Sequence, residues 1–514
     1  MTSNRDQLDR TLSEYDYLLS DRETTGSDLP AILQESRQDS ENSHYDMYEE
    51  SKSSSQFALV NISKQSKLFA FFFVITHFAR EVLHPYISVY LRQLGFNAKE
   101  IGYIGCVQPF VAIFYTSFIG YIADKYSINR YLLTGSLATG FIHMAMYYVP
   151  TIRPKDCIDI CSVNISSSTI PEYQTDCSSF ATPPSTIKNM QRTIYSTSDL
   201  HVVFVYLIFV NIVTQLLGAP WFPLANGYLL AVLGSEKRNQ YAYFKGFGGL
   251  GQIIGGMVAG VTLHMTVYTY THCFIDVNQT RFLACFLMYS VAMFIAAPVG
   301  WWMVNEPGDK EKMKTNKTYT LATFAGALLK LRYISVVIVI MWLAIVAGKL
   351  RTFDFWYINV LGGSYLMMGW GGSISKVCGT ATCFCLPYLN AHIGHIPLLV
   401  AACIGMGASC IIASMTENVT WMVVPLLFRE IAIAISGQAQ GAFLGNAVEN
   451  QYQATLQSVM STLTFGVGNG LGSLLGGELI EDISAEMSYY IFAIISFIMA
   501  VFLILAQIFV KATL

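Results

Sequence analysis

The stretch Gly120-Tyr121-Ile122-Ala123-Asp124-Lys125-Tyr126-Ser127-Ile128-Asn129-Arg130 lies where one long apolar segment ends and the next begins. Its charged residues, Asp124, Lys125 and Arg130, interrupt a sequence that is apolar on both sides. Charged side chains are tolerated at the ends of a membrane span and disfavoured within it. The stretch therefore predicts a short polar link between two membrane-spanning segments.

The composition extends this prediction to most of the chain. Hydrophobic residues make up 53% of the sequence and charged residues 13%, whereas a soluble protein carries about 25% charged residues. The apolar residues fall into about twelve runs, each near the roughly 20 residues that cross a bilayer as a helix. The predicted spans are 68–91, 100–123, 129–150, 200–233, 241–271, 281–304, 331–358, 364–389, 395–415, 419–447, 454–477 and 486–510. Backbone groups in lipid must be paired internally, so we expect an all-α membrane protein.

The first 67 residues differ from the rest, because they are rich in Ser, Asp and Glu and poor in large apolar residues. Such a composition predicts a disordered acidic tail. No apolar signal region follows the start, so we expect the first span to direct insertion and to leave the tail in the cytosol. Glu14 precedes the pair Leu18 and Leu19 by four positions. This pattern resembles an acidic dileucine signal that sorting adaptors read for endosomes and lysosomes, although short acidic patterns also arise by chance.

The basic residues of the links set the expected orientation. Lys64 and Lys67, then Lys125 and Arg130, and a lysine cluster in 305–330 fall on one side of the membrane, which the positive-inside rule makes cytoplasmic. The links of the second half add little to this count. We therefore expect an integral multi-pass protein of the plasma membrane or of endosomes and lysosomes, with its amino terminus in the cytosol.

The third and fifth links then face the opposite, oxidising side. They contain four cysteines and two glycosylation sequons: Cys157, Cys161, Cys177 and Cys273, with Asn164 and Asn278. Four cysteines on one such face predict two disulfides, and three pairings remain open. The alternative is that they are free thiols in a loose loop over 151–199. The cysteines within the spans are expected to be packing residues.

Two spans share a repeated glycine pattern. Gly249-Leu250-Gly251-Gln252-Ile253-Ile254-Gly255-Gly256 in the fifth span aligns with Gly470-Leu471-Gly472-Ser473-Leu474-Leu475-Gly476-Gly477 in the eleventh. The interval of six spans predicts two six-helix halves, 68–304 and 331–510, joined by a cytoplasmic linker over 305–330. Glycines four apart also allow close helix packing in lipid.

Ionisable residues inside the spans are the functional candidates, because each is costly in the bilayer. His77, Arg80, Glu81 and His84 are spaced i, i+3, i+4, i+7 and are expected to share one helical face, as a transport pathway or as a structural ion-pair network. The candidates in the later spans are polar or charged residues: Asn211, Gln215, Asp354, Lys376, Arg429 and Glu430. Lys349, Arg351 and Asp354 have an alternative, since they lie toward a span end and could extend to the interface.

The balance of these charges favours a particular kind of solute. Basic groups outnumber acidic ones in the spans, which favours an anionic or strongly polar solute. A carboxylate can also take up a proton when its cationic partner moves away, and this predicts proton coupling through Glu81 and Glu430.

The link Gly120–Arg130 resembles the cytoplasmic loop signature of the major facilitator superfamily, with Gly120, Asp124, Lys125 and Arg130 in place and Ser127 where a second glycine is usual. Together with the segments 84–96, 101–102 and 223–226 and the glycine runs, it resembles the branch around major facilitator superfamily domain-containing protein 6, related to lactose-permease-type and nucleoside–proton symporters. The resemblance implies a twelve-helix major facilitator fold with two six-helix pseudo-repeats. Spans one, four, seven and ten would line a central cavity, and the four link residues would act in gating.

The resulting functional hypothesis is a secondary active transporter of a small polar or anionic solute, working by alternating access and coupled to protons. Its partners would be the solute, protons, the lipid bilayer and sorting adaptors, with no cofactor, metal or nucleic acid. The alternative is a non-transporting receptor or scaffold that uses the loop 151–199. An enzyme is not expected, because the spans contain no nucleophile–base pair, metal-ligand cluster or phosphate-binding loop.

Overall fold

The computed structural model describes residues 64–126, 128–152, 195–218, 221–233, 240–272, 275–304, 331–447 and 460–512. The elements of the first half of the chain are α3 (Lys64–Leu83), η1 (His84–Tyr86), α4 (Ile87–Gln93), α5 (Ala98–Tyr126), α6 (Asn129–Ala138), η2 (Thr139–His143), α7 (Met144–Tyr147), α10 (Thr197–Gly218), α11 (Trp221–Leu233), α12 (Gln240–Met265), β1 (Val267–His272), β2 (Ile275–Thr280) and α13 (Leu283–Met303). Those of the second half are α15 (Leu331–Val360), α16 (Tyr365–Ile393), α17 (His395–Ser414), η5 (Val419–Met422), α18 (Val423–Ala447), η6 (Leu463–Gly468), α20 (Asn469–Asp482) and α21 (Ala485–Ala512).

Each of the twelve predicted spans overlaps one helix, or consecutive helical elements, in the described part of the chain. Seven of the described helices are long and apolar enough to cross a membrane by length and composition. Several other spans are interrupted. In the first, Pro85 lacks a backbone donor, and a 3₁₀ turn separates α3 from α4 there. In the eleventh, the π-helical turn η6 precedes α20.

The fifth predicted span, 241–271, was wrong at its end. Helix α12 stops at Met265, and β1 pairs antiparallel with β2 from Val267 opposite Thr280 to His272 opposite Ile275. The run Val267-Tyr268-Thr269-Tyr270-Thr271 alternates β-branched and aromatic residues, which favour a pleated strand over a helix. We call the end of the helical bundle that carries this hairpin the hairpin end.

The hairpin is fixed to the helices at its base. Gln93, at the end of α4, donates from Nε2 to the Thr280 carbonyl (3.0 Å) and accepts from the Thr280 amide at Oε1 (3.0 Å). The ring of Tyr90, also on α4, lies edge-to-face on Phe282, the residue before α13, and on Phe286 of α13, at centroid distances of 5.3 and 5.5 Å. The hairpin is therefore tied to the tip of the first span.

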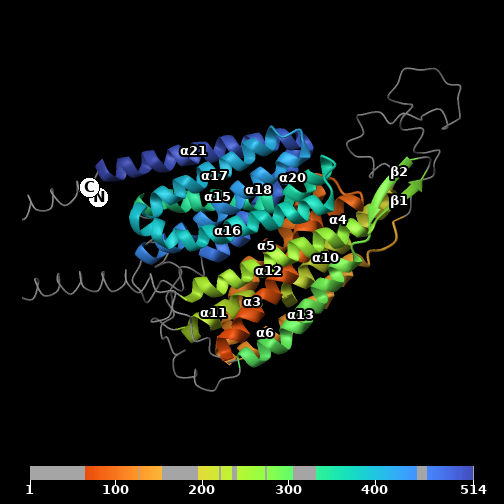
Figure 1. Ribbon diagram of the computed structural model, residues 1–514, viewed down its shortest axis with the longest axis horizontal. Coiled ribbons are helices and arrows are strands. Elements are labelled where there is room, and N and C mark those ends of the chain that lie inside the picture. The colour runs from red at the N-terminus through yellow and green to blue at the C-terminus, as the bar shows by residue number, and fades with distance from the viewer. Residues whose placement is uncertain are drawn as a thin grey trace, which may run out of the picture. The chain divides into compact units, whose positions relative to one another are not determined.

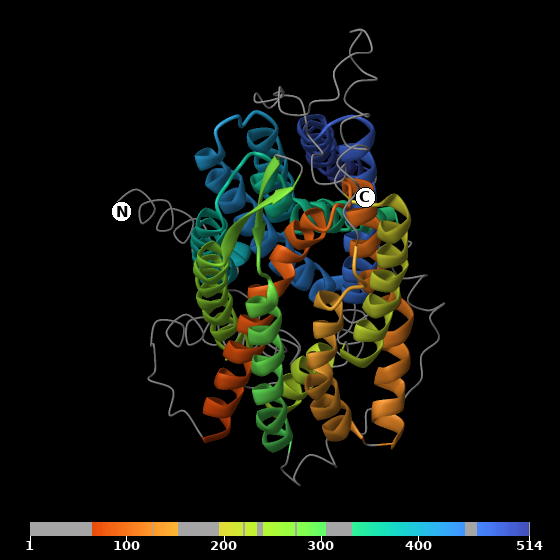
Figure 2. The same ribbon diagram turned by 90° about the vertical axis from the view of Figure 1, so that its right-hand side faces the viewer.

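The helices form two groups, α3–α13 and α15–α21, with the hairpin at one end (Figures 1 and 2). The groups meet along two pairs of helices, α12 against α16 and α5 against α20. Glycines permit this approach: a Cβ at Gly256 would lie 2.8 Å from Ser373 Oγ of α16, and one at Gly477 would lie 2.6 Å from the Ala98 carbonyl oxygen of α5. The repeated glycine runs thus lie where the halves meet, as small residues do between membrane helices.

Polar contacts reinforce this junction at the hairpin end. Lys99 Nζ lies 2.6 Å from Glu478 Oε2, and Tyr103 donates to Glu478 Oε1 at 2.5 Å. Arg92 of α4 donates from Nη1 to the Asn359 side-chain oxygen of α15. The first and second spans of one half are therefore bonded to the first and fifth spans of the other half at this end.

Candidate functional site

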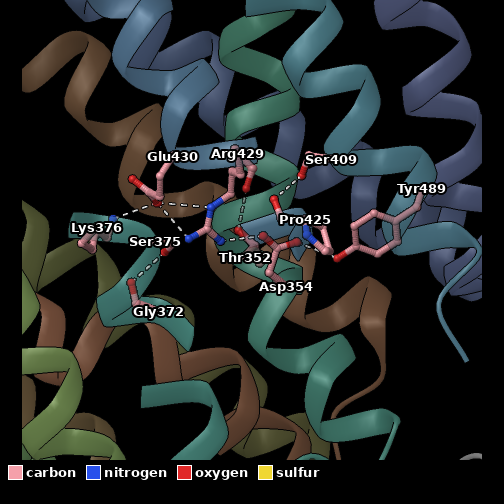
Figure 3. Close-up of polar contacts among 11 residues, drawn as sticks. Thr352, Asp354, Gly372, Ser375, Lys376, Ser409, Pro425, Arg429, Glu430 and Tyr489 are labelled. Carbon is pink, nitrogen blue, oxygen red and sulfur yellow. Dashed lines mark hydrogen bonds and ion pairs between the residues drawn. The ribbon is translucent and has the colours of Figure 1, made fainter. Parts of the chain in front are cut away.

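Arg429 is the centre of a buried polar cluster in the second half (Figure 3). Helix α18 carries it, and its Nη1 donates to Asp354 Oδ2 of α15 at 2.5 Å. Its Nη2 and Nε donate to Oε1 of the neighbouring Glu430 at 2.8 and 3.2 Å. All three side chains are buried. One guanidinium thus holds two carboxylates in a buried region, where an unpaired charge would be costly.

Lys376 extends this cluster to α16. Its Nζ donates to Glu430 Oε1 at 3.0 Å, so this one oxygen accepts from both a lysine and an arginine. The approach of α16 depends on Gly379, because a Cβ there would lie 3.2 Å from Glu430 Cβ. The acid is therefore shared between the eighth and tenth spans of the chain.

Tyr489 and Lys349 complete the cluster on the side of α21. The Tyr489 hydroxyl donates to Asp354 Oδ1 at 2.8 Å. Lys349 Nζ lies 2.7 Å from the centroid of the Tyr489 ring and has no hydrogen-bond partner among the residues that the structure describes. Its side chain is fully buried, at 0% exposure, so the ammonium rests on the electron-rich ring face.

These positions overturn one alternative from the sequence. Lys349 and Asp354 do not extend to a membrane interface, because both are buried among protein helices. Tyr489 covers both, and a sequence pattern within α15 cannot reveal a cover supplied by α21. Arg351 differs from them, since its side chain is exposed although it stands between them on the same helix.

The four ionisable residues predicted to share one face of the first span do not all lie on the same face. His77 lies against Gly248 of α12, and Glu81 is buried against Gly255 of the same helix. Arg80 lies over the Phe222 ring of α11, at 5.9 Å from its centroid. These three residues all lie within α3, so the α-helical spacing predicted from the sequence applies to them.

His84, the fourth residue of that predicted face, lies inside the first half instead. Its ring is 6.1 Å from that of His143 and 5.9 Å from that of Tyr289. Because His84 begins the 3₁₀ turn that contains Pro85, it no longer follows the α-helical rotation of the residues before it.

The polar residues of the fourth span lie on α10. Asn211 is buried and accepts from Gln108 Nε2 of α5 at 3.0 Å, while its own amide donates to the Leu207 carbonyl at 2.8 Å. Gln215, one turn further along, is half-buried. Asn211 thus connects the second and fourth spans of the first half, and the sequence did not indicate Gln108 as its partner.

The non-helical part of the predicted link Gly120–Arg130 is shorter than its polar residues suggested. Helix α5 continues through Gly120, Asp124 and Lys125 to Tyr126, and α6 begins at Asn129. The Arg130 guanidinium lies 3.4 Å from the centroid of the Trp301 ring of α13. At this link, α6 is therefore fixed to α13 by a cation–π contact within the first half.

Several predicted residues lie outside the described part of the chain: Glu14, Leu18, Leu19, Cys157, Cys161, Asn164, Cys177 and Cys273. Asn278 is in β2, paired in register with Thr269. Among the described residues, no group of three or more His, Cys, Asp or Glu is placed to hold a metal ion.

The model of the MFS_1 like family matches residues 59–492. The fold is similar to that of the nucleoside transporter NupG, at 14% identity over 85% of this chain and 99% of that chain, with a TM-score of 0.61. It is also similar to a bacterial homolog of the human lysosomal transporter Spinster in an inward-facing and occupied conformation, at 12% identity over 86% of this chain and 96% of that chain, with a TM-score of 0.58.

A third similar structure is a D-xylose-proton symporter, at 12% identity over 85% of this chain and 96% of that chain, with a TM-score of 0.57. At these identities the likeness concerns the fold, and it extends over nearly the whole length of each compared chain. It confirms the predicted fold class, a multi-pass all-α membrane protein of the twelve-helix type.

Proposed function

The chain belongs to the MFS_1 like family, and we propose that it is a secondary active transporter that moves a small polar or anionic solute by alternating access. The observation that carries this proposal is the buried cluster of Asp354, Arg429, Glu430 and Lys376. Charges inside a membrane are costly, and a protein retains them where they serve a solute or ion pathway. The family also implies a transporter rather than an enzyme.

The ion pairs of this cluster would change if the helices that carry them moved relative to one another. Glu430 accepts from Lys376 of α16 and from its neighbour Arg429, so its partners come from two helices. A shift of α16 against α18 removes one positive charge from this carboxylate and increases its affinity for a proton. Glu81 is the second proton candidate, since it is buried and forms no hydrogen bond or ion pair with another residue in the described ranges.

Glu430→Gln tests the coupling. The full-length protein is reconstituted in proteoliposomes and offered a mixture of nucleosides, pentoses, amino acids and organic acids, with and without a pH gradient. Mass spectrometry then identifies what accumulates. We expect Glu430→Gln to abolish proton-driven accumulation and to leave exchange intact, because the amide fills the same space without carrying a proton. Glu417→Gln, at an exposed loop position, is the matched control.

Two outcomes contradict the proposal at different levels. Accumulation at the full rate in Glu430→Gln would remove this acid from the coupling. No movement of any solute under any gradient would instead favour the receptor or scaffold alternative, which relies on the loop 151–199.

The finer assignments belong to the same proposal. We place the amino-terminal tail in the cytosol, with the plasma membrane or the endosomal and lysosomal membrane as the site of action and sorting adaptors as partners of residues 14–19. Membership of the branch around domain-containing protein 6 rests on the sequence resemblance. Gly120, Asp124, Lys125 and Arg130 are proposed to act in gating.

A further inference from the structure

The packing of the glycine runs defines which residues of the two halves are equivalent. A Cβ at Gly251 of α12 would meet the Val74 carbonyl oxygen of α3 and lie 3.0 Å from the Phe78 amide nitrogen. A Cβ at Gly472 of α20 would meet the Ile345 carbonyl oxygen of α15 and lie 2.7 Å from the amide nitrogen of residue 349. Val74 and Phe78 of α3 therefore correspond to residues 345 and 349 of α15. Equivalent positions on the two helices are 271 residues apart (345 − 74 and 349 − 78).

This register pairs the arginines of the two halves. Arg80 of α3 and Arg351 of α15 are separated by the same 271 positions (351 − 80). They therefore occupy equivalent places on the first helix of each half. Two six-helix repeats related by an axis along the membrane normal place such residues on opposite sides of a common centre, where transporters of this architecture bind their solutes.

The surroundings of Arg351 agree with a position facing that centre. Its side chain is exposed, while Leu350 and Phe353 on the same helix are buried. The charged groups that act on it electrostatically come from both halves: Arg80, Glu81, Arg429 and Glu430. These four residues are carried by two helices, α3 of the first half and α18 of the second, and a lipid-facing arginine would not lie between charged residues of both halves. We infer that Arg351 is exposed toward the interior.

Neither guanidinium is neutralised by an ion pair with the described residues. Arg80 lies over the Phe222 ring, and Arg351 Nη1 donates to the Asn469 side-chain oxygen at 3.2 Å when that amide is oriented to donate to Ala344. The acids of the second half are already engaged, since Asp354 and Glu430 hold Arg429 and Lys376. Arg80 and Arg351 thus act on each other as like charges, and of the two acids that also act on Arg351, Glu430 is already paired and Glu81 is not, within the described part of the chain.

We propose that Arg80 and Arg351 together bind the solute, and that this solute is a small oxyanion carrying two negative charges. A guanidinium presents parallel N–H donors that match a carboxylate or a phosphate group in a bidentate arrangement. Two of them, one from each half, accommodate either the two ends of a dicarboxylate or the oxygens of one phosphate group. The anion also relieves the repulsion between the two cations. This inference rests on the proposed transport function, because it names the class of solute.

Binding to the purified full-length protein provides the direct test. The probes are succinate and inorganic phosphate as dianions, acetate as a monoanion, and uridine and xylose as neutral solutes, each followed by thermal stabilisation in detergent. We expect one or both dianions to stabilise the protein, with acetate and the neutral solutes giving no shift at the same concentrations. Stabilisation by a neutral solute alone, or equally by acetate, would overturn the proposal.

Conservative variants separate charge from geometry. Arg80→Lys and Arg351→Lys keep the positive charge but lose the bidentate donors, so each is expected to raise the half-saturating dianion concentration by about tenfold to a hundredfold. Arg281→Lys, at an exposed position on the hairpin side, is the matched control and should bind as the wild type does. Monodisperse gel filtration of each variant establishes that it is folded. Unchanged binding in either folded variant would contradict the two-arginine site.

Transport assays distinguish the failure of this inference from the failure of the proposed function. If a neutral solute is accumulated in proteoliposomes and no dianion binds, the transporter remains and the two-arginine site is wrong. If a dianion binds through both arginines but crosses under no gradient, the site remains and the transport function is wrong.

Discussion

Arg429 is the side chain through which the two buried acids of the second half are joined. It donates to Asp354 on one side and to Glu430 on the other, and each acid has one further partner, Tyr489 or Lys376. Removing one member of a buried ionic group is more damaging than replacing the group, because the remaining charges lose their compensation. The cluster should therefore respond very differently to single and paired substitutions.

Arg429→Met is expected to lower the stability of the folded protein by about 3–5 kcal/mol, since two acids then share only one cation and one hydroxyl. The double variant Arg429→Met with Asp354→Asn should recover part of this loss, because the amide no longer needs a positive partner. Apparent melting temperatures in detergent measure both effects. A double variant less stable than Arg429→Met would contradict the proposed coupling of the two side chains.

The sequence predicted the members of this cluster more successfully than their pairing. Asp354, Lys376, Arg429 and Glu430 stand out as charges in apolar spans, so composition alone identifies them. Which of them meet depends on the rotation of three helices, α15, α16 and α18, about their axes, and the separation of 75 positions between Asp354 and Arg429 contains no signal for it. Tyr489 was missed because a tyrosine in an apolar span gives no sign that its hydroxyl holds an acid.

At the scale of elements, α12 and α20 are the helices that bring the others together. Each packs on the first span of its own half and on a helix of the other half, as α12 does on α3 and α16. Their glycines meet backbone atoms of the neighbouring helix, which cannot move aside as a side chain can. The glycine repeat was predictable from the sequence, whereas its role in joining the halves required the structure.

Gly472→Ala is expected to reduce the yield of folded, monodisperse protein severely, because its Cβ would meet the Ile345 carbonyl oxygen of α15. Gly135→Ala in α6 is the matched control, since nothing lies within 4 Å of a Cβ there. Alanine is the better helix former by roughly 1 kcal/mol, so the control should be neutral or mildly stabilising. Fluorescence-detected gel filtration compares the two, and equal yields would show that α20 can move away from α15.

At the scale of the whole helical unit, the two halves are held together by ionic contacts at the hairpin end. Lys99 of α5 and Glu478 of α20 form the ion pair there, and the Ala98 amide donates to Glu481 at 3.3 Å. Alternating access requires this end to open, so these contacts must break and form again in each cycle. The hairpin itself was missed by the sequence analysis, because an apolar β-branched run beside a span resembles a continuation of the helix.

Lys99→Glu is expected to favour separation of the halves at the hairpin end, because it places two acids opposite each other. Adding Glu478→Lys restores an opposite pair in reversed order and should return the distance distribution to that of the wild type. Double electron–electron resonance spectroscopy between spin labels at the exposed residues Val267 and Ile483 measures the distance between the halves at this end. If the single and double variants gave the same distribution, the ion pair would have no part in closure.

The contact of Lys349 with the Tyr489 ring has a consequence for the synthesis and membrane insertion of this chain. Its ammonium rests on Tyr489, which the ribosome adds 140 residues later (489 − 349). At about 5–20 residues per second, translation takes roughly 7–28 s to reach that tyrosine. During this interval Lys349 lacks the ring that covers its ammonium in the folded protein. We therefore expect the seventh span to depend on shielding by the insertion machinery until α21 has been made.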